Sequence, residues 1–253
     1  PLAYAKDIMY SKHWHGDRPQ AEKSQDLFLI YDLFVSSFDS EKKFTRWVAY
    51  QMSPQFLWGS SKVVRSLKKD IYLSNYQNKN QVITFKDYKG ASKFEYDKGH
   101  LVPLGSFKGS IFSYQLQYLT NIVPQSRNLN RGPWKFLESK IREFVKKGNE
   151  LRVLVGTLYG QDNYGKPYKK TLPPWPEMQG KIRQIPSGFW KMISFKGAGE
   201  IKVCSFIMPQ KVLSAKVPFT KYIVTKEVLK SYTGLRFFER VKTPIKEDCS
   251  FLN

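Results

Sequence analysis

Three short apolar segments in the second half of the chain constrain its fold most. They are LRVLVGTLY at 151–159, FWKMISF at 189–195 and IKVCSFIMP at 201–209. Apolar runs of this length are typical of central strands in a sheet. A chain of 253 residues is long enough to bury a full core around them.

The first half of the chain adds further strands and one clear helix. Residues 27–35 and 44–52 are rich in apolar and β-branched types, and the polar stretch SSFDSEKK between them reads as a connection. Residues 53–93 look rich in loops. In GPWKFLESKIREFVKKGNE the apolar side chains recur at helical spacing, and a shorter helix is expected in KEVLKSYTG. The apolar stripe of the longer helix consists of Trp134, Leu137, Ile141 and Phe144.

We therefore predict an α+β fold, a mixed α/β single domain with a central antiparallel sheet. Residues 1–25 show no apolar period and are expected to form a loose N-terminal arm, and residues 26–253 to form the domain. The arm holds His13 and His15, for which no third metal ligand is evident. A flexible arm is the favoured interpretation of that pair.

The charge of the chain points to a polyanionic partner. Lys and Arg number 42 against 21 for Asp and Glu, which gives a net charge of +21. Nucleic acid is the first candidate, followed by an anionic membrane or a cell-surface polyanion. The longest apolar stretch, LFLIYDLFV, is broken by Asp32 and is far shorter than a membrane span, so we expect no stable membrane association.

One segment, FEYDKGHLVPLGSF, carries the third histidine of the chain. His100 follows Gly99, whose missing side chain permits close approach of other groups. Asp97 is expected to fix the tautomer and orientation of the imidazole, and Lys98 to meet a phosphate as a point charge. A lone histidine is nevertheless more often structural than catalytic.

A second segment, TNIVPQSRNLNRGPWKFLESKIREF, supplies further polar groups. Asn130 precedes the predicted helix, and Glu138 and Arg142 lie one turn apart at the edge of its buried stripe. Each has an ordinary explanation, Asn130 as a cap and the other two as a surface ion pair. Together with DKGH thirty residues upstream, they favour a functional site.

These segments resemble the DNA/RNA non-specific endonucleases with the ββα-metal (His-Me finger) fold, a family that includes secreted bacterial nucleases and mitochondrial endonuclease G. The resemblance rests on DKGHLVPL, TNIVPQ, NLNRGPW and LESKIR. Further segments that look like family landmarks extend it over about residues 30–240: WVAY, DYKGA, VLVGTLY, IPSGFWK and TGLRFF.

The resemblance implies a hydrolase that cuts phosphodiester bonds within DNA and RNA with one Mg²⁺ or Mn²⁺ ion, leaving 5′-phosphate ends. His100 would be the general base, and Asn130 the one direct protein ligand of the ion. Glu138 would hold water bound to the ion.

It also implies substrate-binding roles for basic and amide side chains. Arg142 and Arg65 would steady the phosphate, and Asn121 matches a family position close to the site. The departure from the family is Lys98, where arginine is usual, because lysine keeps the charge but lacks the planar fork. A catalytically weakened nucleic-acid-binding protein of the same fold is therefore the alternative.

On the residues alone, the two cysteines, Cys204 and Cys249, are compatible with two free thiols and with one disulfide bridge. The resemblance favours a bridge and a secreted or periplasmic protein, with a mitochondrial or other organellar location as the alternative. The start PLAYAKDIMY lacks an initiator methionine, which predicts a processed or trimmed product. Both a monomer and a homodimer stay open.

Overall fold

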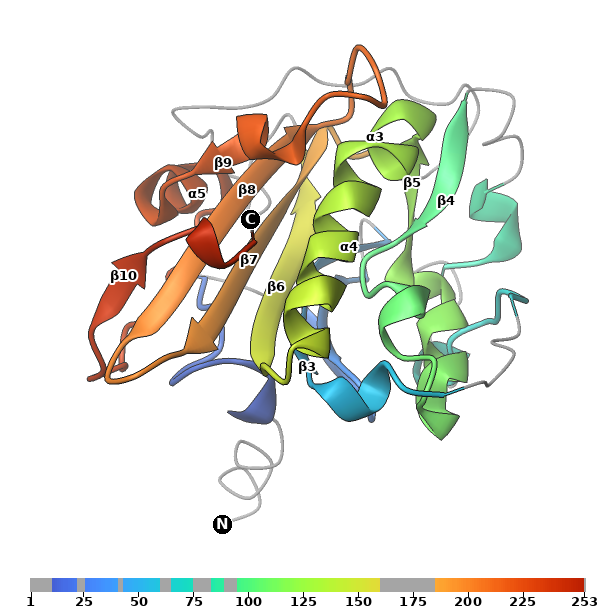
Figure 1. The fold of residues 1–253 in the computed structure, drawn as a ribbon. Coiled ribbons are helices and arrows are strands. Elements are labelled where there is room, and N and C mark those ends of the chain that lie inside the picture. The colour runs from blue at the N-terminus through green and yellow to red at the C-terminus, as the bar shows by residue number, and fades with distance from the viewer. Residues whose placement is uncertain are drawn as a thin grey trace.

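The fold is built around one large mixed sheet and a separate pair of strands (Figure 1). The computed structural model describes residues 11–21, 26–40, 43–59, 65–74, 83–88, 95–159 and 185–252. The large sheet has the strand order β1-β2-β3-β6-β7-β8-β10, with β9 paired to β8. Its strands are β1 (Leu27–Ile30), β2 (Val35–Asp39), β3 (Phe44–Met52), β6 (Leu151–Leu158), β7 (Gly188–Lys196), β8 (Ile201–Pro209), β9 (Ile223–Val224) and β10 (Ile245–Glu247).

Among the described strands of this sheet, the pairs are antiparallel with one exception, the parallel pair of β10 with β8. The smaller sheet pairs β4 (Tyr96–His100) with β5 (Ile122–Ser126). The described helices are α2 (Ile71–Ser74), α3 (Arg127–Arg131), α4 (Pro133–Lys146) and α5 (Lys226–Thr233), and short 3₁₀ segments occupy several of the loops. The predicted α+β fold with a central antiparallel sheet is confirmed.

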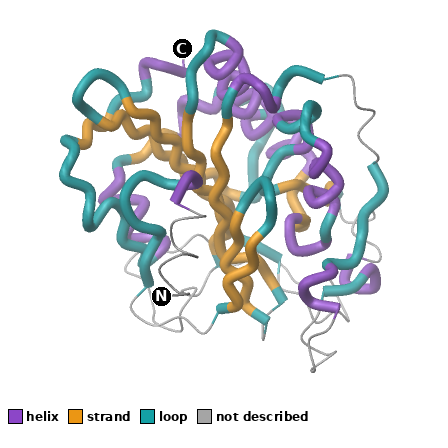
Figure 2. The backbone as a smooth tube through the Cα atoms, turned by 90° about the horizontal axis from the view of Figure 1, so that it is seen from below, coloured by secondary structure: helices purple, strands orange, loops and turns teal. Residues whose placement is uncertain are grey.

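The large sheet buries both of its faces. Along β7, Phe189 and Ile193 belong to the core on the α4 side, whereas Trp190 and Met192 belong to the core beneath α5. This alternation follows from the two-residue period of a strand. Figure 1 shows α4 lying across the front of the sheet, and in Figure 2 helical segments lie on more than one side of the strands.

Helix α4 forms where its sequence predicts it. Pro133 occupies the first turn, where no hydrogen-bond donor is needed, and Gly148 just beyond the helix has a φ of 93° that suits glycine. The buried stripe ends at Val145 rather than Phe144, which is only partly buried. Each large apolar side chain buried in this way contributes about 1.5–3 kcal/mol.

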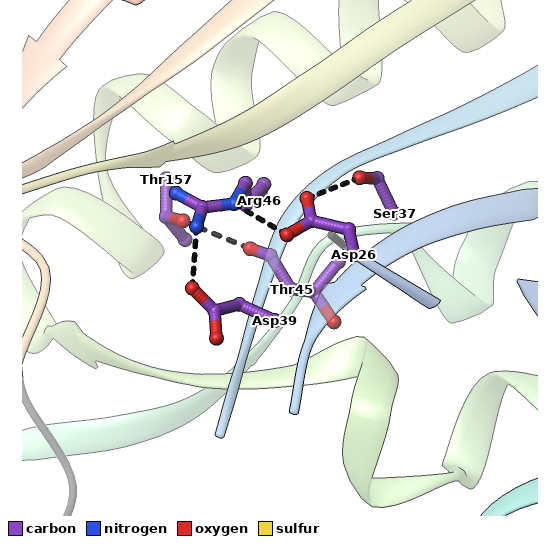
Figure 3. A network of polar contacts seen from close by, with 6 residues as sticks. All are labelled: Asp26, Ser37, Asp39, Thr45, Arg46 and Thr157. Atoms are coloured by element: carbon purple, nitrogen blue, oxygen red, sulfur yellow. Dashed lines mark hydrogen bonds and ion pairs between the residues drawn. The ribbon is translucent and has the colours of Figure 1, made fainter. Parts of the chain in front are cut away.

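The polar stretch SSFDSEKK is not only a connection, because its first four residues lie in β2. The strand tolerates Ser37 and Asp39 because their side chains find buried partners (Figure 3). Ser37 Oγ donates to Asp26 at 2.6 Å, and Arg46 Nε donates to the other oxygen of Asp26 at 2.8 Å. Arg46 Nη2 also donates to Asp39. Sequence pattern alone misses this strand, because the polar side chains of Ser37 and Asp39 are paired inside the protein.

The N-terminal segment differs from the expected loose arm over its described part, residues 11–21. His13 and Trp14 are buried, and the Gln51 N–H donates to His13 Nδ1 at 3.2 Å. Trp14 joins the core on the α5 side of the sheet. Residues 1–10 and 22–25 lie outside the described residues, and the domain boundary at residue 26 stays a prediction.

The C-terminal segment is tied to the sheet by a covalent bond. Cys204 on β8 and Cys249 form a disulfide, which closes a separation of 45 residues. The bridge favoured by the family resemblance is therefore present. Among the described residues, none of the helices is both long enough and apolar enough to pass through a membrane.

We predict that Arg46→Met destabilises the fold by about 3–5 kcal/mol, because it leaves two buried carboxylates without their guanidinium. Urea unfolding measures the loss. The matched control is Lys140→Met, which removes an exposed ion pair with Glu143 on α4 and should cost at most about 1 kcal/mol. Equal effects of the two substitutions would contradict the importance of the buried network.

Candidate active site

The candidate site begins at the pair β4 and β5, which contacts α3 (Figure 1). Gly99 pairs with Val123 in this antiparallel ladder. A Cβ at Gly99 would lie 2.5 Å from Gln125 Oε1 and 2.8 Å from Gln125 Cβ. Glycine precedes the histidine because the side chain of Gln125 occupies the space that any other residue would need.

His100 is the last residue of β4 and is held as a neutral imidazole. Burial lowers its pKa to about 4, opposed by a side-chain hydrogen bond with Gln117 and assisted by the positive charge of Arg65. The imidazole Nε2 is buried and has no hydrogen-bond partner among the described residues. A neutral ring with an unengaged nitrogen is the form that can accept a proton.

Asp97 does not orient His100 as the sequence suggested. The two residues are three positions apart on one strand, so their side chains leave opposite faces. Asp97 instead accepts hydrogen bonds from Asn130 Nδ2 at 2.9 Å and from Arg131 Nη2 at 2.7 Å. Burial opposes ionisation of Asp97, but the bonds from Arg131 and Asn130 prevail and lower its pKa. Asp97 thus ties β4 to α3.

Asn130 is oriented by this contact. Because its amide nitrogen donates to Asp97, its carbonyl oxygen is left for another group, and amide oxygens are ligands that magnesium accepts. The described residues contain no cluster of three or more His, Cys, Asp or Glu side chains suited to a metal. The available oxygen of Asn130 fits an ion that takes one protein ligand and keeps most of its water.

Glu138 and Arg142 lie on the side of α4 that borders the loop after His100. Their closest atoms, Glu138 Oε2 and Arg142 Nη1, are 4.0 Å apart. Arg142 Nη2 donates to Ser139 Oγ at 2.9 Å, and Nη1 would lie 3.7 Å from a Cβ placed on Gly105. The pKa of Glu138 is raised by burial, against the opposing charges of Lys191 and Arg142.

Lys191 is a buried cation beside this pair. Its side chain is 0% exposed, its Nζ lies 3.6 Å from Glu138 Oε1, and it sits 3.9 Å from the centre of the Trp134 ring. Burial lowers the pKa of Lys191 to about 8, against the opposing effect of Glu138. The sequence signal for it is a lysine inside the apolar run FWKMISF.

The remaining predicted residues are placed around His100. Arg65 and Lys98 are exposed, and Lys98 leaves β4 on the same face as His100. Asn121 is fully buried, where its side chain bonds the backbone of Val102 and Leu116. It therefore holds the loop after His100 in place and has no amide group left for substrate.

The site contains polar residues that sequence reasoning missed. Gln117 bonds His100, and its segment pairs with that of Arg65, because Lys68 N–H donates to the Gln117 carbonyl at 2.9 Å. Arg131 pairs with Asp97. Neither residue stands out in the sequence, since their roles depend on which loops meet in space.

Comparison with known proteins identifies the family of the chain. The family model described as DNA/RNA non-specific endonuclease matches residues 18–244. The chain is 28% identical to the Nuclease of Serratia marcescens over 84% of this chain and 75% of the relative. It is 29% identical to mitochondrial Endonuclease G of Caenorhabditis elegans over 86% of this chain and 70% of the relative.

A chain in the crystal structure of the EndoG/EndoGI complex shares the fold. Its TM-score is 0.70 at 24% sequence identity, covering 88% of this chain and 91% of that chain. At this identity the likeness supports the fold alone. Because the family match extends over most of the sequence, the protein is a nucleic-acid hydrolase that belongs to the DNA/RNA non-specific endonuclease family.

Proposed function

We propose that this protein is a one-metal, sugar-non-specific endonuclease that cuts DNA and RNA and leaves 5′-phosphate and 3′-hydroxyl ends. The observation that carries the proposal is His100, whose neutral imidazole has a buried Nε2 without a hydrogen-bond partner in the described part of the chain. In this role Nε2 takes the proton of the attacking water. Gln117 holds the ring while the proton is transferred.

Asn130 is the proposed protein ligand of Mg²⁺ or Mn²⁺, presented by its bond to Asp97. A bound ion would stabilise the charge that develops on the phosphate and the departing 3′ oxygen, with Glu138 accepting hydrogen bonds from its water. Strands β4 and β5, with the helices α3 and α4 that follow them, would form the ββα finger that brings these groups together.

Arg142, Arg65 and Lys98 are the proposed phosphate contacts. Arg65 lies close enough to His100 to affect its pKa, and Lys98 shares its strand face. Contacts to phosphate carry no base information, so they suit a nuclease that does not select sequence or sugar. The net charge of +21 adds affinity that should fall steeply with salt.

The compartment and assembly are proposed on separate grounds. A disulfide between Cys204 and Cys249 suits an oxidising compartment, which supports export to the periplasm or the cell exterior. The relatives also include proteins named as mitochondrial nucleases, which is the alternative location. A homodimer stays a prediction.

A catalytically weakened binding protein is the second candidate, favoured by Lys98 in place of the family arginine. It predicts a gel shift with DNA and no cleavage that depends on a divalent cation. The hydrolytic proposal predicts cleavage of plasmid and RNA with Mg²⁺ that EDTA abolishes.

We predict that His100→Ala lowers the cleavage rate by about 10²–10⁴-fold, because the general base is lost. Digestion of plasmid and RNA with Mg²⁺ measures the change. The control is His15→Ala, a partly buried histidine in the N-terminal segment, which should keep its activity. Unchanged cutting by His100→Ala would remove this residue from its role.

We predict that the acid limb of kcat/KM lies below the ordinary histidine pKa of about 6.5, because burial favours the neutral ring. The lowered pKa of about 4 means that the imidazole stays neutral as pH falls through 6. Initial rates from pH 4 to pH 9 on one oligonucleotide measure it. An acid limb at or above pH 6.5 contradicts a base buried in this way.

We predict that Asp97→Asn raises the Mg²⁺ concentration needed for half-maximal activity by about 10–100-fold, because Asn130 loses its orienting carboxylate. Rates measured over a Mg²⁺ titration give this value. The control is Glu95→Gln, which changes an exposed carboxylate next to β4. An unchanged Mg²⁺ requirement would separate Asp97 from the metal site.

A further inference from the structure

Lys191 carries a charge in the middle of a buried strand. It occupies the centre of β7 between Phe189 and Ile193, with which it shares the face toward α4. Its side chain is 0% exposed. Lysine is almost never fully buried unless it is paired, so its location requires a specific partner.

Both partners of Lys191 come from α4 and lie one turn apart. The ammonium Nζ contacts Glu138 Oε1 at 3.6 Å and lies 3.9 Å from the centre of the Trp134 ring. The other oxygen of the carboxylate, Oε2, faces Arg142 Nη1 at 4.0 Å. Glu138 is therefore held by one oxygen inside the protein, while the other is directed toward the arginine proposed to contact phosphate.

Stability alone is a weak explanation for this arrangement. A buried ion pair gains little over well-packed apolar residues, because removing both charges from water costs about as much as their attraction returns. A mobile glutamate, by contrast, serves poorly at a site that needs a carboxylate in one place. What the pair provides is a fixed carboxylate.

We propose that Lys191 is a positioning residue that fixes the Glu138 carboxylate against Trp134 and presents Oε2 to the active site. The proposal rests on the proposed function, in which Glu138 accepts hydrogen bonds from water at the metal. Lys191 itself touches neither substrate nor metal. Its effect must therefore pass through Glu138.

The test compares Lys191→Met with wild type, in the wild-type background and with Glu138→Gln. Lys196→Met is the matched control, since Lys196 lies on the same strand and is exposed. Each variant is assayed for kcat and KM on one oligonucleotide and for Mn²⁺ affinity by calorimetry. Thermal unfolding checks that each is folded, and crystal structures locate the Glu138 carboxylate.

In Lys191→Met we expect a displaced Glu138 carboxylate, kcat and Mn²⁺ affinity reduced by about 10–100-fold, and KM changed by less than about threefold. With Glu138→Gln already present, the same substitution should change kcat by less than about threefold, because the carboxylate through which Lys191 acts is no longer there. Lys196→Met should match wild type. If Lys191→Met does not fold, Lys191→Gln is the second variant, with the same expectations.

Two results would overturn the proposal. One is a Glu138 carboxylate that stays in place when Lys191 is replaced, and the other is an equal loss of kcat in both backgrounds, which indicates general structural damage. Failure of the proposed function looks different. In that case the wild-type protein shows no metal-dependent cleavage, and the position of Glu138 in the crystal structures still decides the role of Lys191.

Discussion

The packing of α4 on one face of the sheet is the constraint on which the candidate site depends. The stripe that includes Trp134, Leu137 and Ile141 locks the helix against β3, β6 and β7. Once that stripe is buried, Glu138 and Arg142 can only leave the helix at its edge, toward the loop after His100. The hydrophobic core thus fixes where the polar groups stand, and a helix that rotated would move them all.

Polar contacts act together with this packing to position the residues of the candidate site. Asp97 joins the strand that ends in His100 to the segment that carries Asn130, so that a direct hydrogen bond links the segments of the proposed base and the proposed metal ligand. Lys191 contacts Glu138 from the face of β7 that points toward α4. Buried charges of this kind are costly unless paired, and each here has a partner of opposite sign.

Part of this structure could be predicted from the sequence, and the reasons are physical. Helix α4 and the strands β6, β7 and β8 could be predicted from the spacing and length of their apolar segments. A helix that buries one stripe has apolar residues at helical spacing, and a strand buried on both faces is a short continuous apolar run. Strand β2 could not be recognised, since Ser37 and Asp39 look like loop residues until Asp26 and Arg46 are known to meet them.

The candidate site could likewise be predicted only in part. The motif pointed to His100 and Asn130, but the link through Asp97, the contact of Gln117 and the role of Lys191 require that distant segments be brought together.

The central claim is that Asn130 presents a metal ion within reach of a water that His100 can deprotonate. A crystal structure of the protein soaked with Mn²⁺, with the ion located by its anomalous scattering, tests this most directly. We predict one ion bound to Asn130 Oδ1, Glu138 contacting its water, and His100 Nε2 on the same side. An ion held elsewhere, or none on Asn130 at saturating Mn²⁺, would contradict it.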